Sequence, residues 1–516
     1  MQRINGIKLF LGEDESLLIK KVSKVLRVNP SNIKYFKIVK KSLDARDKSN
    51  MFYIYNIDVS LVEEKPQKPT YKRVNGTVTV VGSGPCGLFC ALFLARSGVK
   101  VTLLERGACV EERAKINDKF FTTTILNTEC NIQFGEGGAG TFSDGKLNTQ
   151  VNNERIKTVL EEFVAFGAPD EITYLSKPHL GSDNLPKIVK NIRNEIIRLG
   201  GTVIFNAKVC DLVIEKGKLL GLTYKKDGLS HTIFSDKTVF AIGHSARDTF
   251  EMLNSYGVAM ESKDFAVGFR IEHLQSEIGF AQYGKEYKRL PSADYKLVSH
   301  AGERDVFSFC MCPGGVVMPA TSEANCVVTN GMSEYARDKV NANSAIVCKV
   351  TRADFIGEDP LSGVRFQREL ENKAFVAGGE NYKAPVQLVR DFLQNKESAS
   401  FGGVMPSYSI GTTFYPLHQF FSKSITNSIA LAVLDMSKKI KGFCDNGAIF
   451  TGVESRTSSP LRILRGENLQ SVNLAEFYPA GEGAGYAGGI TSAAADGIKV
   501  ATAIIEQFAD KLNLNE

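Results

Sequence analysis

The sequence predicts an α/β protein with a doubly wound parallel sheet, an inserted α+β domain and a small N-terminal α+β module. Two observations predict this class. An apolar run at 77–81 (TVTVV) leads into a helix-forming segment, PCGLFCALFLARSG, and then into a second apolar run, VKVTLLE, which is the pattern of a βαβ unit. Strand-like runs between polar turns recur from residue 201 to 245, so we expect distant segments to complete the same sheet.

The N-terminal module is expected to span residues 1–75, ending in a charged, proline-containing linker (EEKPQKPTYKR). A short strand at 4–11 precedes apolar residues at helical spacing, and two more strand-like runs follow before residue 62. This segment holds 16 Lys and Arg residues against 8 Asp and Glu residues. The excess suits a solvated helix face, and a nucleic-acid surface is the less favoured interpretation.

The remaining chain divides into three expected segments. Residues 76–260 form the first part of the doubly wound domain, 261–440 form an inserted substrate or cap domain, and 441–516 return to the first domain. The inserted segment mixes short strands with irregular runs and ends in an apolar helix, NSIALAVLDMSKKI.

Composition narrows the class of protein. The chain of 516 residues is 43% apolar and 23% charged, which is typical of a globular protein. No apolar stretch approaches the roughly 20 residues of a membrane span, and acidic residues interrupt the N-terminal apolar run, so we expect a cytoplasmic protein. The ten cysteines lack metal-ligand spacing, and no metal site is expected.

The turn VVGSGPCG carries the first binding motif. Its glycines, Gly82, Gly84 and Gly87, have the G-x-G-x-x-G spacing, in which the first permits a tight turn, the second lets backbone approach a pyrophosphate and the third allows helix–strand packing. Pro85 and Cys86 complete this turn. Glu105 follows Gly87 by 18 residues at the end of the second strand, where a carboxylate accepts hydrogen bonds from a ribose.

This pattern predicts a Rossmann-like site for an adenosine diphosphate group and leaves NAD and FAD unresolved. The continuation ERGACVEERAK resembles that of flavoproteins in the glutathione-reductase-like superfamily. Within that resemblance Arg106 follows the ribose-binding acid, and Arg113 would face the pyrophosphate.

The stretch FYPAGEGAGYAGGITSAAADGI, at residues 477–498, resembles the second flavin motif of the same superfamily. Gly481 and Glu482 form its glycine–acid pair, and Glu482 would accept hydrogen bonds from the ribityl chain. Gly489 and Ile490 open the helix that follows, whose free N–H groups would point at the flavin ring. The far end of one FAD molecule therefore explains this stretch.

Three weaker segments complete the expected FAD contacts. Ala241 and Gly243 in TVFAIGHS resemble the strand that returns past the cofactor, and Val209 lies where these flavoproteins use main-chain groups on the adenine. The glycine-rich loop NIQFGEGGAGTFSDGKLNT has no βαβ context, so its glycines are expected to bring backbone close to the flavin or substrate. Its contributing residues are Gly138, Gly140 and Lys146.

A closer resemblance spans almost the whole chain. SLDAR (42–46), VVGSGPCG, FGEGGAGTFSDGKL, FCMCPGG, GVESRTSSP and GEGAGYAGGI together resemble an uncharacterised FAD-dependent oxidoreductase family, often labelled NAD(FAD)-utilising dehydrogenases. The resemblance implies an FAD-dependent oxidoreductase acting on a small-molecule substrate, with NAD(P)H as a transient donor. The alternatives are a flavoprotein that binds or modifies RNA and a non-redox FAD-binding protein.

No catalytic residue is assigned from the sequence. Cys310 and Cys312 are either structural or redox-active thiols on the substrate side of the flavin. Glu454 and Arg456 either form an internal ion pair in a charged loop, or bind an anionic substrate or shape the flavin pocket. His244 is a proton-donor candidate, as is His418, although neither histidine has a motif around it.

Overall fold

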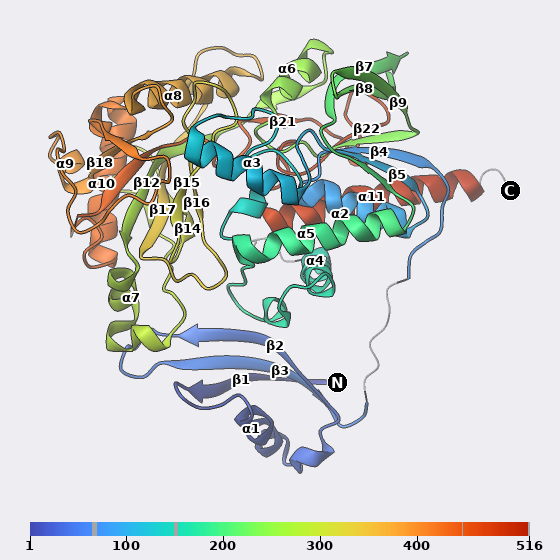
Figure 1. Cartoon of the computed structure of the whole chain (residues 1–516). Helices are drawn as coiled ribbons and strands as arrows, with labels where there is room; N and C mark the ends of the chain where they lie inside the picture. The colour runs from blue at the N-terminus through green and yellow to red at the C-terminus, as the bar shows by residue number, and fades with distance from the viewer. Residues whose placement is uncertain (64–69, 149–152, 446, 514–516) are drawn as a thin grey trace.

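A computed structural model describes residues 1–63, 70–148, 153–445 and 447–513 of the chain. The structure has a doubly wound domain, a cap built on a large mixed sheet, and a small module beneath them (Figure 1). The predicted α/β class is confirmed. No helix in these ranges is both long and apolar enough to cross a membrane.

The doubly wound domain contains a five-stranded parallel sheet. Its order is β22 (Phe477–Pro479), β10 (Lys237–Phe240), β4 (Thr77–Val81), β5 (Lys100–Leu104) and β6 (Thr202–Ile204). One face is covered by α2 (Pro85–Arg96), α5 (Gly181–Arg198) and α11 (Ile490–Asn513), and α4 (Glu154–Ala165) packs on the outer side of these helices. The short strands β10 and β22 are buried along their whole length, and β4 is buried from Val78 onward, because both faces of the sheet are covered.

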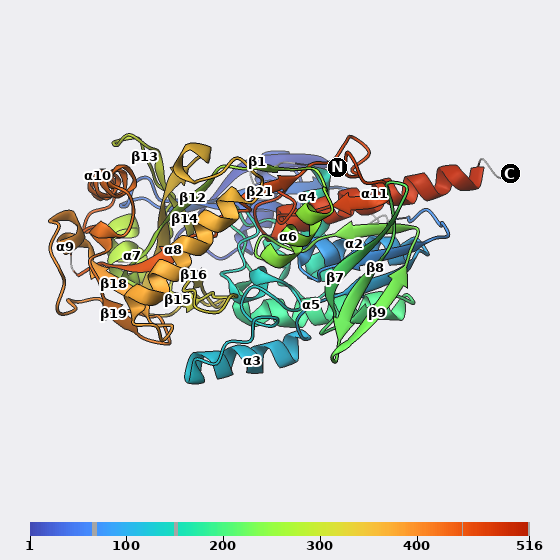
Figure 2. The ribbon, with the colours of Figure 1, turned by 90° about the horizontal axis from the view of Figure 1, so that it is seen from above.

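The opposite face of the parallel sheet packs against a second layer. An antiparallel sheet of β7 (Lys208–Glu215), β8 (Lys218–Lys226) and β9 (Leu229–Phe234) lies there with α6 (Arg247–Ser255) (Figure 2). Helix α3 (Val110–Thr123) follows β5 and leads into the glycine-rich loop.

The cap contains a seven-stranded sheet. Its order is β13 (Val298–Ser299), β14 (Val306–Cys312), β17 (Asn341–Val350), β12 (Phe265–Leu274), β20 (Ile449–Glu454), β18 (Ala384–Leu388) and β19 (Thr412–Phe414). Alternate residues of β12, from Phe265 to His273, enter the apolar core of the cap, which α8 (Ser362–Gly378) and α10 (Lys423–Lys439) complete. The intervening residues, including Arg270, therefore face the other side of the sheet.

The chain returns to the doubly wound domain later than residue 440. Strand β20 lies inside the 441–516 segment, yet it pairs with β12 and β18 in the cap sheet. All six residues of its run IFTGVE are buried, so the strand has no exposed face that would assign it to either domain. Two short pairs complete the body: β11 (Met260–Ser262) with β21 (Leu461–Ile463), and β15 (Val316–Pro319) with β16 (Thr329–Met332).

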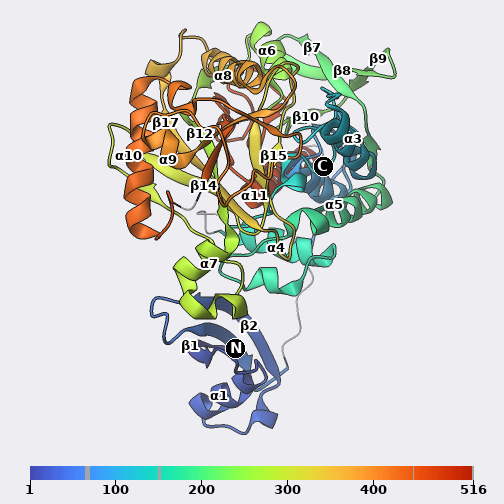
Figure 3. The same cartoon turned by 60° about the vertical axis from the view of Figure 1, so that its left-hand side comes forward.

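The N-terminal module is a three-stranded antiparallel sheet with one helix. The strands are β1 (Gln2–Phe10), β2 (Tyr35–Asp44) and β3 (Phe52–Ser60), in the order β1-β3-β2, and α1 (Leu17–Leu26) packs on one face. The backbone of Lys41 bonds to Tyr174 and Ser176, and Lys48 donates to the carbonyl of Ala281 in α7 (Gln275–Tyr283), the helix nearest the module in Figure 3.

Candidate functional site

A cavity of about 350 Å³ lies between the doubly wound domain and the cap. It begins at the carboxyl ends of the parallel strands, where Val81, Leu104, Ala241 and Ala480 line it. Ligands of doubly wound folds bind at this edge of the sheet. The end nearest the mixed sheet, called the cap end below, is lined by Phe309, Cys310, Asn330, Glu454, Arg456 and Thr457.

The turn after β4 has the geometry expected of a nucleotide fingerprint. A Cβ atom on Gly87 would lie 1.8 Å from the carbonyl oxygen of Gly82, so only glycine allows α2 to pack this closely on the turn. At Gly84 the nearest atom to such a Cβ is 3.9 Å away, and this residue lines the cavity. Backbone is thus open to a ligand at Gly84.

Glu105 lies at the end of β5 beside this turn and is 5% exposed. One carboxylate oxygen accepts from the amide of Ser83 at 2.9 Å and from its hydroxyl at 2.8 Å. The other accepts from the amides of Gly107, at 2.9 Å, and Gly135, at 3.0 Å. The carboxylate therefore ties three segments together and still lines the cavity, where a ribose hydroxyl can reach it.

The glycine-rich loop closes one side of the cavity. A Cβ atom on Gly138 would lie 3.1 Å from the Cα of Gly84, and one on Gly140 would lie 2.8 Å from Cγ1 of Ile490. The small residues of this loop thus let it contact both the fingerprint turn and the start of α11. Both glycines line the cavity.

Arg113 differs from the expectation. Its fully buried guanidinium donates to five backbone carbonyls of the glycine-rich loop and does not line the cavity. Burial lowers the pKa of Arg113 to about 10. Sequence position did not reveal this role, because the loop folds back over α3 through contacts that no local pattern specifies. The acceptors are Asn131, Ile132, Gly135, Glu136 and Gly138.

The C-terminal motif lines the same cavity as the fingerprint. Glu482, Gly489 and Ile490 are lining residues, and a Cβ on Gly489 would meet nothing within 4 Å. The first N–H groups of α11 have no helical acceptor and face this region. Burial raises the pKa of Glu482 to about 7, while Lys263 opposes the increase.

His244 lies beside Glu482, with Nε2 4.0 Å from Oε1 of that carboxyl group. Burial, together with Arg456 and Arg247, lowers the pKa of His244 to about 3. The imidazole is neutral at neutral pH and is therefore a poor proton donor. His418 does not line the cavity and bonds instead to Gln387.

The residues expected to contact the cofactor separate into two sets. Gly87, Arg113 and Gly481 do not line the cavity; Gly481 packs against Cys86 of α2, and its amide donates to Asp496. The others line it together: Gly82, Gly84, Pro85, Cys86, Glu105, Arg106, Gly138, Gly140, Lys146, Val209, Ala241, Gly243, Glu482, Gly489 and Ile490.

At the cap end, ionisable groups from three distant segments meet. Lys146 forms an ion pair with Asp144 at 3.3 Å, and Arg270 approaches Glu454 at 3.2 Å. Burial raises the pKa of Glu454 to about 7, against the opposing effect of Arg270. Asp144 belongs to the glycine-rich loop that the sequence singled out. Arg270 had no motif around it, because the pairing of β12 with β20 brings it to the site.

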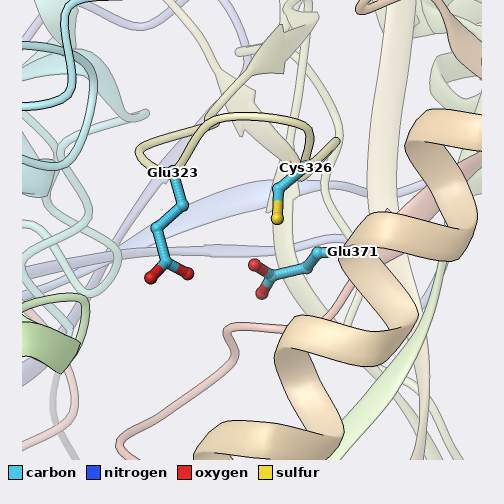
Figure 4. A group of neighbouring side chains, drawn as sticks. All are labelled: Glu323, Cys326 and Glu371. Atoms are coloured by element: carbon cyan, nitrogen blue, oxygen red, sulfur yellow. The ribbon is translucent and has the colours of Figure 1, made fainter. Parts of the chain in front are cut away.

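Glu454 and Arg456 do not pair with one another. Arg456 forms a bidentate ion pair with Glu371, which also pairs with Arg247. Glu323 and Cys326 lie close to Glu371 (Figure 4). Glu323 accepts hydrogen bonds from Arg247 and Arg368. Because guanidinium groups neutralise both carboxylates, the cluster is a buried ion-pair network beside the cavity.

The comparisons with known proteins agree with this site. Residues 75–119 match a family described as FAD binding domain, and residues 264–457 match one described as FAD-dependent protein, C-terminal domain-like. Residues 1–60 match a domain of unknown function. The fold and the site define an FAD-binding flavoprotein, and FAD is its cofactor.

An uncharacterized protein of Clostridium beijerinckii is 45% identical to the chain over 530 residues, covering 98% of this chain and 99% of the relative. The protein belongs to the same family as this relative.

Several solved structures show weaker similarity to the chain. A flavin-dependent brominase is 13% identical, with 84% of this chain and 80% of that chain covered and a TM-score of 0.38. The glycerol-3-phosphate dehydrogenase from Bacillus halodurans complexed with FAD is 12% identical, with 86% and 66% covered and a TM-score of 0.36. A geranylgeranyl bacteriochlorophyll reductase-like protein from Thermoplasma acidophilum is 11% identical, with 85% and 80% covered and a TM-score of 0.36.

Proposed function

We propose that the protein is an FAD-dependent oxidoreductase that transfers hydride or electrons between a transient donor, NAD(P)H, and a small-molecule substrate bound at the cap end. Bound FAD supplies the redox chemistry, and the chain positions it. The resemblance to glutathione-reductase-like flavoproteins supports this reaction class.

One observation carries the proposal: the cavity continues from the fingerprint turn, past the start of α11, to a set of ionisable side chains in the cap. A purely structural cofactor needs no such groups beside its redox-active half. Lys146, Cys310 and Glu454 are placed to bind a polar substrate and to exchange protons with it.

The roles of the other lining residues follow from their positions. Gly84 leaves its amide open to the pyrophosphate, and Glu105 holds the adenosine ribose. The N-terminus of α11 provides partial positive charge where a reduced flavin carries negative charge. Val209 lines the cavity near Glu105 and Arg106, where main-chain groups can meet the adenine.

The test is anaerobic addition of NADH or NADPH to the purified yellow holoprotein, followed by flavin absorbance. Bleaching by either nucleotide supports the proposal. A flavin that dithionite reduces but neither nucleotide bleaches contradicts NAD(P)H as donor. A flavin that neither dithionite nor any other donor reduces favours the non-redox alternative.

A further inference from the structure

Two thiols lie in a bulge at the cap end. Strand β14 pairs regularly with β17 up to Phe309, which faces Ala345, and the register then shifts so that Cys312 faces Asn343. Cys310 sits inside this bulge with φ of +44°. A non-glycine residue in this left-handed region is uncommon.

The bulge brings the two thiols within reach of one another. Both are free, Cys310 lines the cavity, and Cys312 is fully buried behind it. The Sγ of Cys312 donates to the carbonyl of Cys310 at 3.3 Å. Cα atoms two residues apart are separated by at most about 7 Å in an extended chain. A disulfide requires a separation of roughly 4.4–6.8 Å. The thiols of Cys310 and Cys312 also form a side-chain hydrogen bond with one another, so the two sulfur atoms lie close together.

Positive groups surround the pair. Arg270 donates to the carbonyl of Cys310 at 2.6 Å and to Sγ of Cys312 at 3.8 Å. Interaction with the Cys312 thiol lowers the pKa of Cys310, burial opposes this, and Lys146 and Arg270 lower it further. The pKa of Cys312 is raised by its interaction with Cys310 and by burial. In the reduced pair, Cys310 is therefore favoured as the thiolate and Cys312 as the thiol.

The pair also faces the redox half of the cofactor site. Cys310 is close enough to Glu482 and to Glu454 to raise the pKa of each carboxyl group by charge repulsion. Glu454 is 3% exposed, lines the cavity, and its Oε2 forms no hydrogen bond with any residue that the structure describes. A residue beside the pair thus lines the cavity and carries a buried acceptor without a partner, which native structures rarely leave unexplained.

We propose that Cys310 and Cys312 are a dithiol–disulfide couple that exchanges two electrons with the bound FAD. In the oxidising direction, the Cys310 thiolate and the Cys312 thiol form one S–S bond and lose two electrons and one proton. Oxidised FAD accepts both electrons and the proton, so the step balances without another reagent. The reverse step regenerates the two thiols from reduced FAD. This inference deepens the proposed oxidoreductase function and rests on it.

The test measures how many electrons the oxidised holoprotein accepts. The holoprotein is oxidised with diamide, desalted and titrated anaerobically with dithionite while flavin absorbance is followed. Wild type should consume about two two-electron equivalents per FAD, whereas Cys310→Ser and Cys312→Ser should each consume about one. Cys444→Ser, a thiol outside the cavity, is the matched control and should behave as wild type.

Mass spectrometry provides a second readout that needs no variant. After diamide treatment and alkylation under denaturing conditions, the wild-type peptide containing both cysteines should be two hydrogens lighter than its reduced form and unalkylated. Two alkylated thiols in that peptide, or an extra equivalent that persists in both serine variants, would overturn the proposal. If NADH and NADPH fail to bleach the flavin, only the proposal that NAD(P)H is the donor is contradicted. The thiol couple is still tested, because the titration with dithionite needs neither nucleotide.

Discussion

The α-carbon of Gly87 faces the carbonyl oxygen of Gly82 so closely that an added Cβ would lie 1.8 Å from that oxygen. The first turn of α2 is therefore fixed against the end of β4. Gly488 offers a contrast, because a Cβ there would meet nothing within 4 Å although the residue lines the cavity. Gly87 is therefore needed for the fold of the site, whereas Gly488 leaves space for the ligand.

Alanine at these two positions should have opposite consequences. Gly87→Ala should lower stability by about 2 kcal/mol or more, because backbone must move to remove the overlap. Gly488→Ala should leave the thermal midpoint of the apoprotein nearly unchanged and weaken FAD binding by intruding on the cavity. Thermal unfolding and FAD titration of the apoproteins separate these outcomes; equal stability losses in both variants would contradict the assignment.

Replacing Arg113 should loosen the glycine-rich loop without removing a ligand contact. Arg113→Lys retains a charge, but an ammonium has three donors for five carbonyls that now receive bonds from Arg113. We expect faster proteolysis between residues 131 and 146 in the apoprotein and weaker FAD binding. Arg155→Lys, on the outer surface of α4, is the control. A protected loop in the Arg113 variant would show that other contacts hold it.

His244 should make the apoprotein less stable in acid. The pKa of His244 is about 3 in the folded chain, below its ordinary value near 6.5, so only the unfolded chain takes up a proton on this residue between these values. Its stabilising contribution is present above pH 6.5 and is lost as pH falls, by about 1.4 kcal/mol per pH unit. Between pH 7 and pH 5, the thermal midpoint of His244→Asn should fall less than that of the wild type. Replacement of the exposed His231 should leave the fall as large as in the wild type. Identical falls in all three proteins would disprove the assignment.

Lys146 should control the reactivity of Cys310. Lys146 lowers the pKa of this thiol. The other charged or titratable groups that face it are Cys312, Arg270, Asp144, Glu454 and Glu482. Lys146→Met should therefore shift the pH at which iodoacetamide alkylates Cys310 upward, with slower alkylation at pH 7. Peptide mapping measures the rate at this one residue. Lys157→Met, which removes an exposed lysine on α4, should leave the profile unchanged.

Local sequence was sufficient where one continuous segment builds the feature. The βαβ unit, the glycine turn and Glu105 occur within 29 residues of chain, and the close contact at Gly87 has the role that the spacing predicted. The C-terminal motif was also recognisable, because a strand, a glycine turn and a helix start follow one another directly. FAD as the cofactor is confirmed by the family matches.

Features formed by long-range pairing could not be predicted from the sequence. Arg270 and Glu454 lie on strands β12 and β20, separated by 184 positions, and only their register brings them together. Arg113 was misjudged for the same reason, since its partners belong to a loop that follows α3. The thiol pair required knowledge of a bulge, which shifts the register of β14 without a glycine or proline to mark the shift.

The central claim is that one FAD molecule is held at two places nearly four hundred residues apart, and FAD titration of the apoprotein tests it most directly. The measurement compares wild type with Glu105→Ala, Glu482→Ala and the exposed control Glu112→Ala. We predict one FAD per chain, affinity reduced about 10-fold or more in each of the first two variants, and no change in the control. A chain that binds no FAD, or unchanged affinity in both Glu105→Ala and Glu482→Ala, would contradict the account.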